Sequence, residues 1–158
     1  SNGNFNSPIK FNAPILLDAS GWFSSNPKFN NTIIGSFRSV VNMGFFFWNA
    51  SSFNKPINDW DIRNVLIFTG FMQGATSFDQ DLSAWPAKFN VNADIAGVSA
   101  APNWSTENYD KYLNALWLDV GTTRQNEWAI GTSPKTVYAT VKRSAASQAA
   151  VSLYLIHI

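Results

Sequence analysis

The chain has 158 residues, a formal net charge of +1 and no Cys, and 15% of its residues are aromatic against 13% charged. This balance excludes a disordered tail, because so many large apolar side chains can bury a core. The sequence also excludes a disulfide framework, has no run of Lys or Arg that would capture nucleic acid, and has no apolar stretch of about 18 residues that would insert into a membrane.

One phrase recurs along the first two thirds of the chain. It reads FNSPI at residue 5, FNNTI at 29, FNKPI at 53 and FDQDL at 78, so the steps are 24, 24 and 25 residues. A fixed period of this length predicts stacked turns, whose equivalent residues pile into shared apolar ladders.

Five columns of residues keep this period. They are Phe5, Phe29, Phe53 and Phe78; Ile9, Ile33, Ile57 and Leu82; Leu17, Val41, Val65 and Asn90; Phe23, Phe47 and Met72; and Asn26, Ala50 and Ala75. Trp60 and Trp85 add a 25-residue step, where the first two units have Asn12 and Ser36. The predicted repeat core is therefore Phe29, Phe53, Phe78, Ile33, Ile57, Leu82, Val41, Val65, Phe47, Met72, Trp60 and Trp85.

The predicted fold is a leucine-rich-repeat-like solenoid of about four coils over residues 1–97, with short stacked parallel strands. The best strand candidates are residues 15–19, 39–43, 63–68 and 88–92. The aromatic segment 45–52 predicts a helix or a tight turn opposite those strands. FNAPI at residue 11 repeats the phrase out of phase, so we expect the first unit to be irregular, as terminal repeats often are.

Residues 98–158 depart from the period and predict a small helix–strand–helix subdomain. Tyr109, Leu113, Leu116, Trp117 and Val120 would share one face of a first helix that Ser105 or Thr106 caps. Alternation over 137–141 predicts a strand, and the Ala-rich stretch 145–154 predicts a second helix. This subdomain would cover the apolar end of the stack, and the alternative is a module that binds a partner.

The two central units resemble the repeat of BspA-like leucine-rich surface proteins, which is widespread in mycoplasma surface lipoproteins. They read NMGFFFWNASSFNKPINDWDIRNV and FTGFMQGATSFDQDLSAW. The matching residues are Asn42, Met43, Phe47, Ala50, Phe53, Asn54, Ile57, Trp60, Asn64 and Val65, then Phe71, Met72, Ala75, Phe78, Leu82 and Trp85. The resemblance covers roughly residues 15–155, although the first unit matches less well and Asp79 replaces the Asn of the family pattern.

This resemblance implies a non-enzymatic domain, secreted or displayed on the cell surface, that serves adhesion to or recognition of a host protein or glycan. The alternative is a structural component of a virion or surface filament, whose rigid solenoid docks on neighbouring subunits at the virion surface. The two classes differ in stoichiometry, because an assembly component self-associates whereas a recognition domain binds a foreign ligand as a monomer.

The sequence offers few groups for chemistry. His157 is the only histidine and is the next-to-last residue of the sequence as given, so we predict no catalytic, metal-binding or cofactor-binding residue there. Asp59, Asp61, Asp79 and Asp81 are the candidate calcium ligands, and the other functional interpretation of these two pairs is the acid and base of a glycosidase. We favour a structural role for them, because Asp at a turn commonly bonds to its own backbone.

One aromatic residue lies outside the repeat columns. Trp48 follows the pair Phe46 and Phe47, and its counterpart one unit later is Gln73, so the ladders do not require it. Since Trp is common at binding hot spots, Trp48 is the predicted exposed contact for a protein or glycan partner.

Overall fold

The computed structural model describes residues 3–122 of the chain. The predicted strand at 137–141, the predicted helix at 145–154 and His157 therefore lie outside the described residues. In chain order the elements are β1 (Ile9–Lys10), β2 (Ile33–Ile34), the 3-10 helices η1 (Pro86–Lys88) and η2 (Ala96–Ser99), and the α-helix α1 (Thr106–Thr122).

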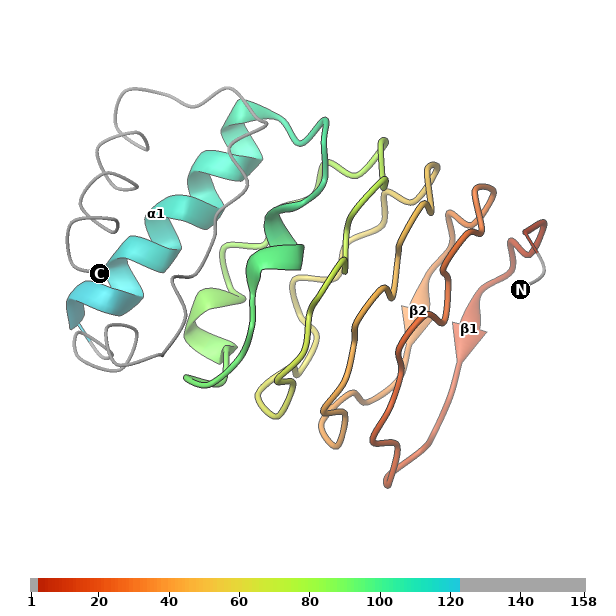
Figure 1. Ribbon diagram of the computed structural model, residues 1–158, viewed down its shortest axis with the longest axis horizontal. Coiled ribbons are helices and arrows are strands. Elements are labelled where there is room, and N and C mark those ends of the chain that lie inside the picture. The colour runs from red at the N-terminus through yellow and green to blue at the C-terminus, as the bar shows by residue number, and fades with distance from the viewer. Residues whose placement is uncertain (1–2, 123–158) are drawn as a thin grey trace.

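The chain returns beside itself at regular intervals (Figure 1). β1 pairs with β2 in parallel, with Ile9 opposite Ile33. A second line of parallel bridges joins Asp18 to Asn42, Asn42 to Ile67 and Ile67 to Asp94, which are 24, 25 and 27 residues apart. We name the four successive turns by the recurring phrase: the first turn is residues 5–28, the second 29–52, the third 53–77 and the fourth 78–103.

Regular strands are shorter than predicted and lie elsewhere. Among the described residues, the candidates 15–19, 39–43 and 63–68 each contribute a single bridge residue, and in the fourth turn the bridge falls on Asp94, beyond 88–92. The reason is local hydrogen bonding on both sides of the bridge. In the second turn Val40 donates its N–H to Phe37 O, and Phe46 donates to Met43 O, so only the few residues between them stay extended. The leucine-rich-repeat assignment stays a prediction.

A stack of aromatic rings runs through the interior. Phe5 and Phe29 have ring centroids 6.0 Å apart, Phe29 and Phe53 5.8 Å, and Phe53 and Phe78 6.1 Å, with interplanar angles of 11°, 7° and 7°. Trp104 extends the stack 5.8 Å beyond Phe78 with a ring that is tilted by 58°. Offset stacking of the four Phe rings at these separations is favourable in addition to the burial of the rings.

Eleven of the twelve predicted core residues are buried. They are Phe29, Phe53, Phe78, Ile33, Ile57, Leu82, Val65, Phe47, Met72, Trp60 and Trp85. Val41 is half-buried, and Val40 is the residue that lies in the core. The third turn has one more residue than the second before this position, so Val40 and Val65 are the structural equivalents: each donates its N–H to the carbonyl three residues earlier, Phe37 and Ile62.

A second set of aromatic rings is in contact across the turns without keeping the sequence period. The period places Asn12 and Ser36 opposite Trp60, but the ring that packs against Trp60 comes from Phe37, and the ring that packs against Phe37 one turn earlier comes from Phe11. Phe37 lies 5.1 Å from Phe11 and 4.3 Å from Trp60, and Trp60 lies 6.4 Å from Trp85. The out-of-phase phrase at residue 11 thus supplies the ring that the first turn needs.

Two residues in each of the first three turns have left-handed backbone angles. They form two columns one period apart: Gly21, Phe45 and Gly70, then Ser25, Asn49 and Gly74. These angles reverse the chain within the segment 45–52, which consists of turns and contains no helix.

The helix α1 covers the last turn (Figure 1). It packs against η1 and buries Tyr109, Tyr112, Leu113 and Leu116. The ring of Tyr112 lies 5.3 Å from that of Trp104. Trp104 thus links the ring stack to α1, and the boundary between residues 97 and 98 stays a prediction.

Candidate functional site

A ladder of side-chain amides links the turns beside the ring stack. The side-chain oxygen of Asn6 accepts the backbone N–H of Asn30 (2.9 Å), that of Asn30 accepts the N–H of Asn54 (3.0 Å), and that of Asn54 accepts the N–H of Asp79 (2.9 Å). Asp79 accepts the N–H of Ser105 (3.0 Å) and ends the ladder. Each oxygen thus satisfies a backbone donor of the next turn.

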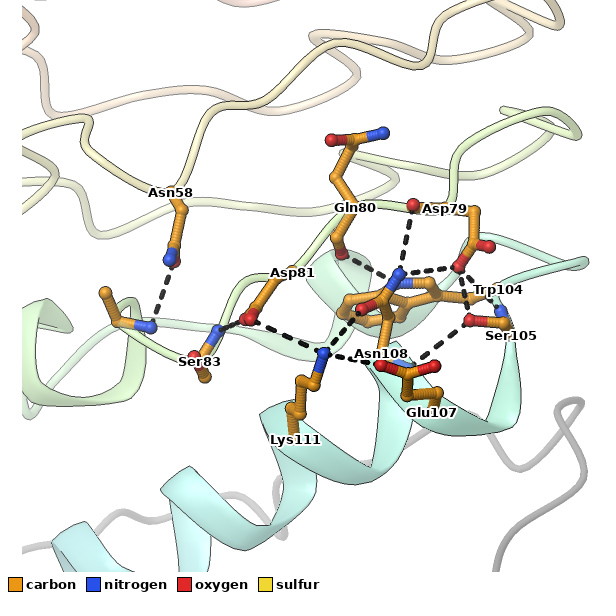
Figure 2. Close-up of polar contacts among 11 residues, drawn as sticks. Asn58, Asp79, Gln80, Asp81, Ser83, Trp104, Ser105, Glu107, Asn108 and Lys111 are labelled. Atoms are coloured by element: carbon orange, nitrogen blue, oxygen red, sulfur yellow. Dashed lines mark hydrogen bonds and ion pairs between the residues drawn. The ribbon is translucent and has the colours of Figure 1, made fainter.

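The last position of this ladder differs because a helix follows it (Figure 2). Asp79 Oδ1 accepts the Ser105 hydroxyl at 2.6 Å and Asn108 Nδ2 at 3.0 Å, while the Ser105 hydroxyl in turn accepts the N–H of Asn108 at 3.3 Å. Ser105 is therefore the N-cap of α1, and the carboxylate lies at the positive end of the helix dipole. Burial alone would raise the pKa of Asp79, but the hydrogen bonds from Ser105 and Asn108 outweigh it and hold the pKa below its ordinary value.

Lys111 connects the helix to the neighbouring turn (Figure 2). Its ammonium lies 2.8 Å from Glu107 Oε1 and 4.0 Å from Asp81 Oδ2. Asp81 also accepts the N–H of Ser83 at 2.7 Å. Lys111 therefore supplies a positive charge to both Glu107 and Asp81.

The four candidate calcium ligands lie in two pairs, each served by protein cations. Asp61 forms a bidentate contact with Arg63 at 2.8 and 2.9 Å, and these hydrogen bonds lower the pKa of Asp61. Burial lowers the pKa of Lys88, and the negative charges of Asp59 and Asp61 partly oppose this shift. The Lys88 ammonium donates to Asn58 O at 2.7 Å and to Trp60 O at 3.1 Å.

Asp79 and Asp81 have the partners described above. Across the described residues, no group of three or more His, Cys, Asp or Glu side chains is arranged to hold a metal ion. The carboxylates of Asp61 and Asp81 accept backbone N–H groups within their turns, and that of Asp79 caps α1.

An exposed apolar ridge crosses the outside of the second and third turns. We call Phe45, Trp48 and Ile67 the outer ridge. Phe45 is 46% exposed and Ile67 is 41% exposed, whereas Trp48 is half-buried. The ring of Phe45 meets that of Trp48 edge-on at 6.4 Å. The predicted contact, Trp48, thus belongs to the ridge but is not its most exposed member.

Phe45 occupies its position at a conformational cost. Its φ is 57°, whereas the equivalent positions are Gly21 and Gly70. A bulky side chain is disfavoured in this left-handed region by about 1–2 kcal/mol. Its ring lies over Gly70, where an added Cβ would come within 2.6 Å of the ring. The sequence does contain a signal for this residue, because Phe45 interrupts a column of glycines.

Ile67 also interrupts a column. Its equivalents Asp18, Asn42 and Asp94 each accept, through a side-chain oxygen, the backbone N–H two residues later. Ile67 has no such oxygen, and its Cγ2 lies 3.6 Å from where a Cβ on Gly44 would be. An apolar side chain therefore replaces a turn-stabilising one beside Phe45.

In the part of the chain that the structure describes, none of the helices is long and apolar enough to cross a membrane.

Comparison with known proteins places the chain in a family. A family model described as "Mycoplasma protein of unknown function, DUF285" matches residues 1–108, and this family is associated with BspA-like repeat proteins. No curated protein and no solved structure shows significant similarity to the chain. Because the family model matches more than half of the 158 residues, the chain belongs to the DUF285 family.

Proposed function

We propose that this protein is a non-catalytic recognition domain, displayed outside the cell or on its surface, that binds a host protein or glycan through the outer ridge. The stacked turns, in our proposal a leucine-rich-repeat-like solenoid, act as a rigid support for that ridge. The family match and the resemblance of the central units to surface repeat proteins support this proposal.

The proposal rests on the exposure and the backbone angle of Phe45. A large ring is exposed to solvent and held at a backbone angle where both neighbouring turns have glycine. Glycine there would remove the strain, so the stability of the fold does not account for the ring. Strained positions of this kind cluster at binding sites, and exposed aromatic rings supply much of the energy of recognition.

The acidic groups of the third and fourth turns support a non-catalytic role. The Asp side chains at 61, 79 and 81 are engaged by Arg63, Ser105 and Ser83, so each carboxylate has a structural task. We propose no catalytic residue and no cofactor.

A structural role in a virion or surface filament is the second candidate function. The observation that favours it is the first turn, which carries the exposed aliphatic side chains of Ile15 and Leu17. Self-association alone does not make a filament, so the outer ridge remains the basis of the first proposal.

The test is a binding screen on a glycan array and on a panel of host extracellular proteins, with the wild type and three variants. Phe45→Gly restores the residue of the equivalent turns, and we expect it to leave thermal stability unchanged or higher while weakening any binding by about tenfold or more. Leu17→Ser, an exposed apolar residue outside the ridge, is the control and should bind like the wild type. Binding that survives both Phe45→Gly and Trp48→Ala would refute the proposal.

A further inference from the structure

The outer ridge lies on a part of the stack that carries negative charge and no positive charge. Backbone hydrogen bonds join the segments 17–25, 41–49, 66–73 and 94–97 of successive turns side by side, and we call these segments the bridged face. Within them Asp18 and Asp94 are the only charged residues. The Lys and Arg residues of the described chain all belong to other segments of the turns or to α1. Such a charge pattern favours a partner that brings cations.

The two aspartates lie at either end of one line of bridges. The line runs from Asp18 through Asn42 and Ile67 to Asp94, so the ridge residue Ile67 lies between the two carboxylates. Hydrogen-bonded chains are about 4.8 Å apart, which places the two aspartates about 14 Å from each other. Phe45 lies beside this line, with its ring over Gly70. The apolar ridge is thus flanked by one negative charge on each side.

Neutral groups hold the Asp18 carboxylate in place. Its Oδ1 accepts the N–H of Ser20 at 2.7 Å, and its Oδ2 accepts the side-chain amide of Asn42 at 3.0 Å. Hydrogen bonds from Ser20 hold the pKa of Asp18 below its ordinary value. Asp18 therefore keeps its negative charge at neutral pH.

Asp94 is held in the same way. Its Oδ1 accepts the N–H of Ala96 at 3.2 Å, and its Oδ2 accepts the hydroxyl of Thr69 at 3.3 Å. No salt bridge among residues 3–122 involves Asp18 or Asp94, whereas Asp61 and Asp81 have cationic partners. An ionised carboxylate has about four acceptor sites, so both aspartates can still accept donors from a partner.

The shape of the ridge favours a protein ligand over a glycan. The rings of Phe45 and Trp48 meet at an interplanar angle of 86°, so they form a corner and not the flat surface on which a sugar ring stacks. The amide of Asn42 is already engaged, because its Oδ1 accepts the N–H of Gly44 and its Nδ2 donates to Asp18. An aromatic centre with charged groups around it is typical of protein–protein interfaces.

We propose that the partner of the outer ridge is a protein segment whose apolar side chains are flanked on both sides by Lys or Arg. The apolar side chains cover the ridge, and the two cations contact Asp18 and Asp94. In an extended segment, cations four residues apart are separated by about 13 Å, close to the separation of the two aspartates. The inference rests on the proposed recognition function and specifies the chemistry of its ligand.

The experiment measures binding of the full chain to an array of short peptides. Each peptide has Lys or Arg at two positions four residues apart, with varied apolar residues between them, and its matched control has Glu at both positions. We expect a subset of the cationic peptides to bind, each about tenfold or more tightly than its Glu counterpart. This binding should weaken as the salt concentration rises, because salt screens exposed charges.

Two variants test the role of the aspartates. Asp18→Asn and Asp94→Asn keep the oxygen that accepts the N–H two residues later, as Asn42 does at the equivalent position, so both should keep the fold. Each should weaken the binding of cationic peptides by about two- to fivefold. The matched control is Asp59→Asn, which removes the same charge from an exposed aspartate outside the bridged face and should bind like the wild type.

The outcomes separate this inference from the recognition proposal. A full chain that binds no cationic peptide, or binds the Glu counterparts equally well, would overturn the inference. So would equal weakening by Asp18→Asn and Asp59→Asn. A glycan whose binding depends on Phe45 but not on Asp18 or Asp94 would overturn the inference and leave the recognition proposal standing. Peptide binding that both Phe45→Gly and Trp48→Ala leave unchanged would refute the recognition proposal itself.

Discussion

At the position after each stacked phenylalanine, the side chain is a carboxamide in the first three turns and a carboxylate in the fourth. Asn30 and Asn54 each have one backbone N–H of the next turn to satisfy. Asp79 lies beside a helix N-terminus, and its carboxylate accepts hydrogen bonds from the N–H and the hydroxyl of Ser105 and from the side-chain amide of Asn108. A negative charge is favourable at that end of a helix, so the departure of Asp79 from the family pattern has a local electrostatic reason.

Replacing Asp79 by Asn should therefore make stability less dependent on pH. We expect Asp79→Asn to lower the free energy of unfolding by about 0.5–2 kcal/mol at pH 7, because the charge at the helix N-terminus is lost. The folded-state pKa of Asp79 lies below the ordinary value of 3.8, so its stabilisation is fully present above about pH 4 and is lost as the pH falls through the folded pKa. Urea unfolding of both proteins between pH 7 and pH 3 measures the difference, which should shrink at the acid end.

The control for this series is Asp59→Asn. It removes the same charge from an exposed aspartate whose carboxylate accepts no hydrogen bond from the described residues. If Asp59→Asn and Asp79→Asn lose the same stability, the capping role of Asp79 is wrong.

At the scale of elements, the turns are held by side-chain columns more than by strands. Only β1 and β2 form a regular strand pair in the described part, and each has two residues. The ring stack, in contrast, runs from Phe5 to Trp104. Each ring fills the space between its two neighbours, so removal of one ring leaves a cavity that the neighbouring turns close only partly.

Phe53→Ala tests this stack at its centre. Phe53 is fully buried and stacks on Phe29, Phe47 and Phe78. We expect the free energy of unfolding to fall by about 3–5 kcal/mol, the usual cost of truncating a buried Phe. Phe45→Ala removes an equally large but exposed ring and should cost far less. Chemical denaturation of both variants makes the comparison, and equal losses would contradict the role of the stack.

The sequence allows this column to be predicted because Phe29, Phe53 and Phe78 keep a constant step. It does not allow the choice between Val40 and Val41, since the second and third turns differ by one residue and the period alone does not say where the extra residue lies. The sequence predicts one residue of the outer ridge, Trp48, because the repeat columns do not require it. It does not directly predict the exposure of Phe45, because this exposure follows from a left-handed backbone angle, and the only sequence sign of that angle is the glycine at the equivalent positions 21 and 70.

At the scale of the whole described part, residues 3–122, the candidate calcium ligands lie beside protein cations. Asp61 contacts Arg63, and Asp81 lies 4.0 Å from the ammonium of Lys111. A calcium ion needs six to eight oxygen ligands and would have to displace these cations.

We therefore expect millimolar calcium to leave the thermal midpoint of the wild type unchanged relative to the same protein in EDTA. A ligand that binds only the folded state raises stability in proportion to the logarithm of its concentration, so a calcium titration monitored by thermal denaturation is a sensitive test. A midpoint that climbs steadily with calcium, and that Asp59→Asn abolishes, would establish an ion site after all.

The amide ladder also has a consequence for how such a chain can change its length. Every Asn in the ladder meets the same backbone group one period later, so a duplicated or deleted unit of about 25 residues would leave every junction correctly bonded. Asp79 alone is tied to its place, because only the final unit faces a helix. In a longer or shorter chain with the same repeat, an aspartate after the recurring phenylalanine would therefore mark the last unit of the stack.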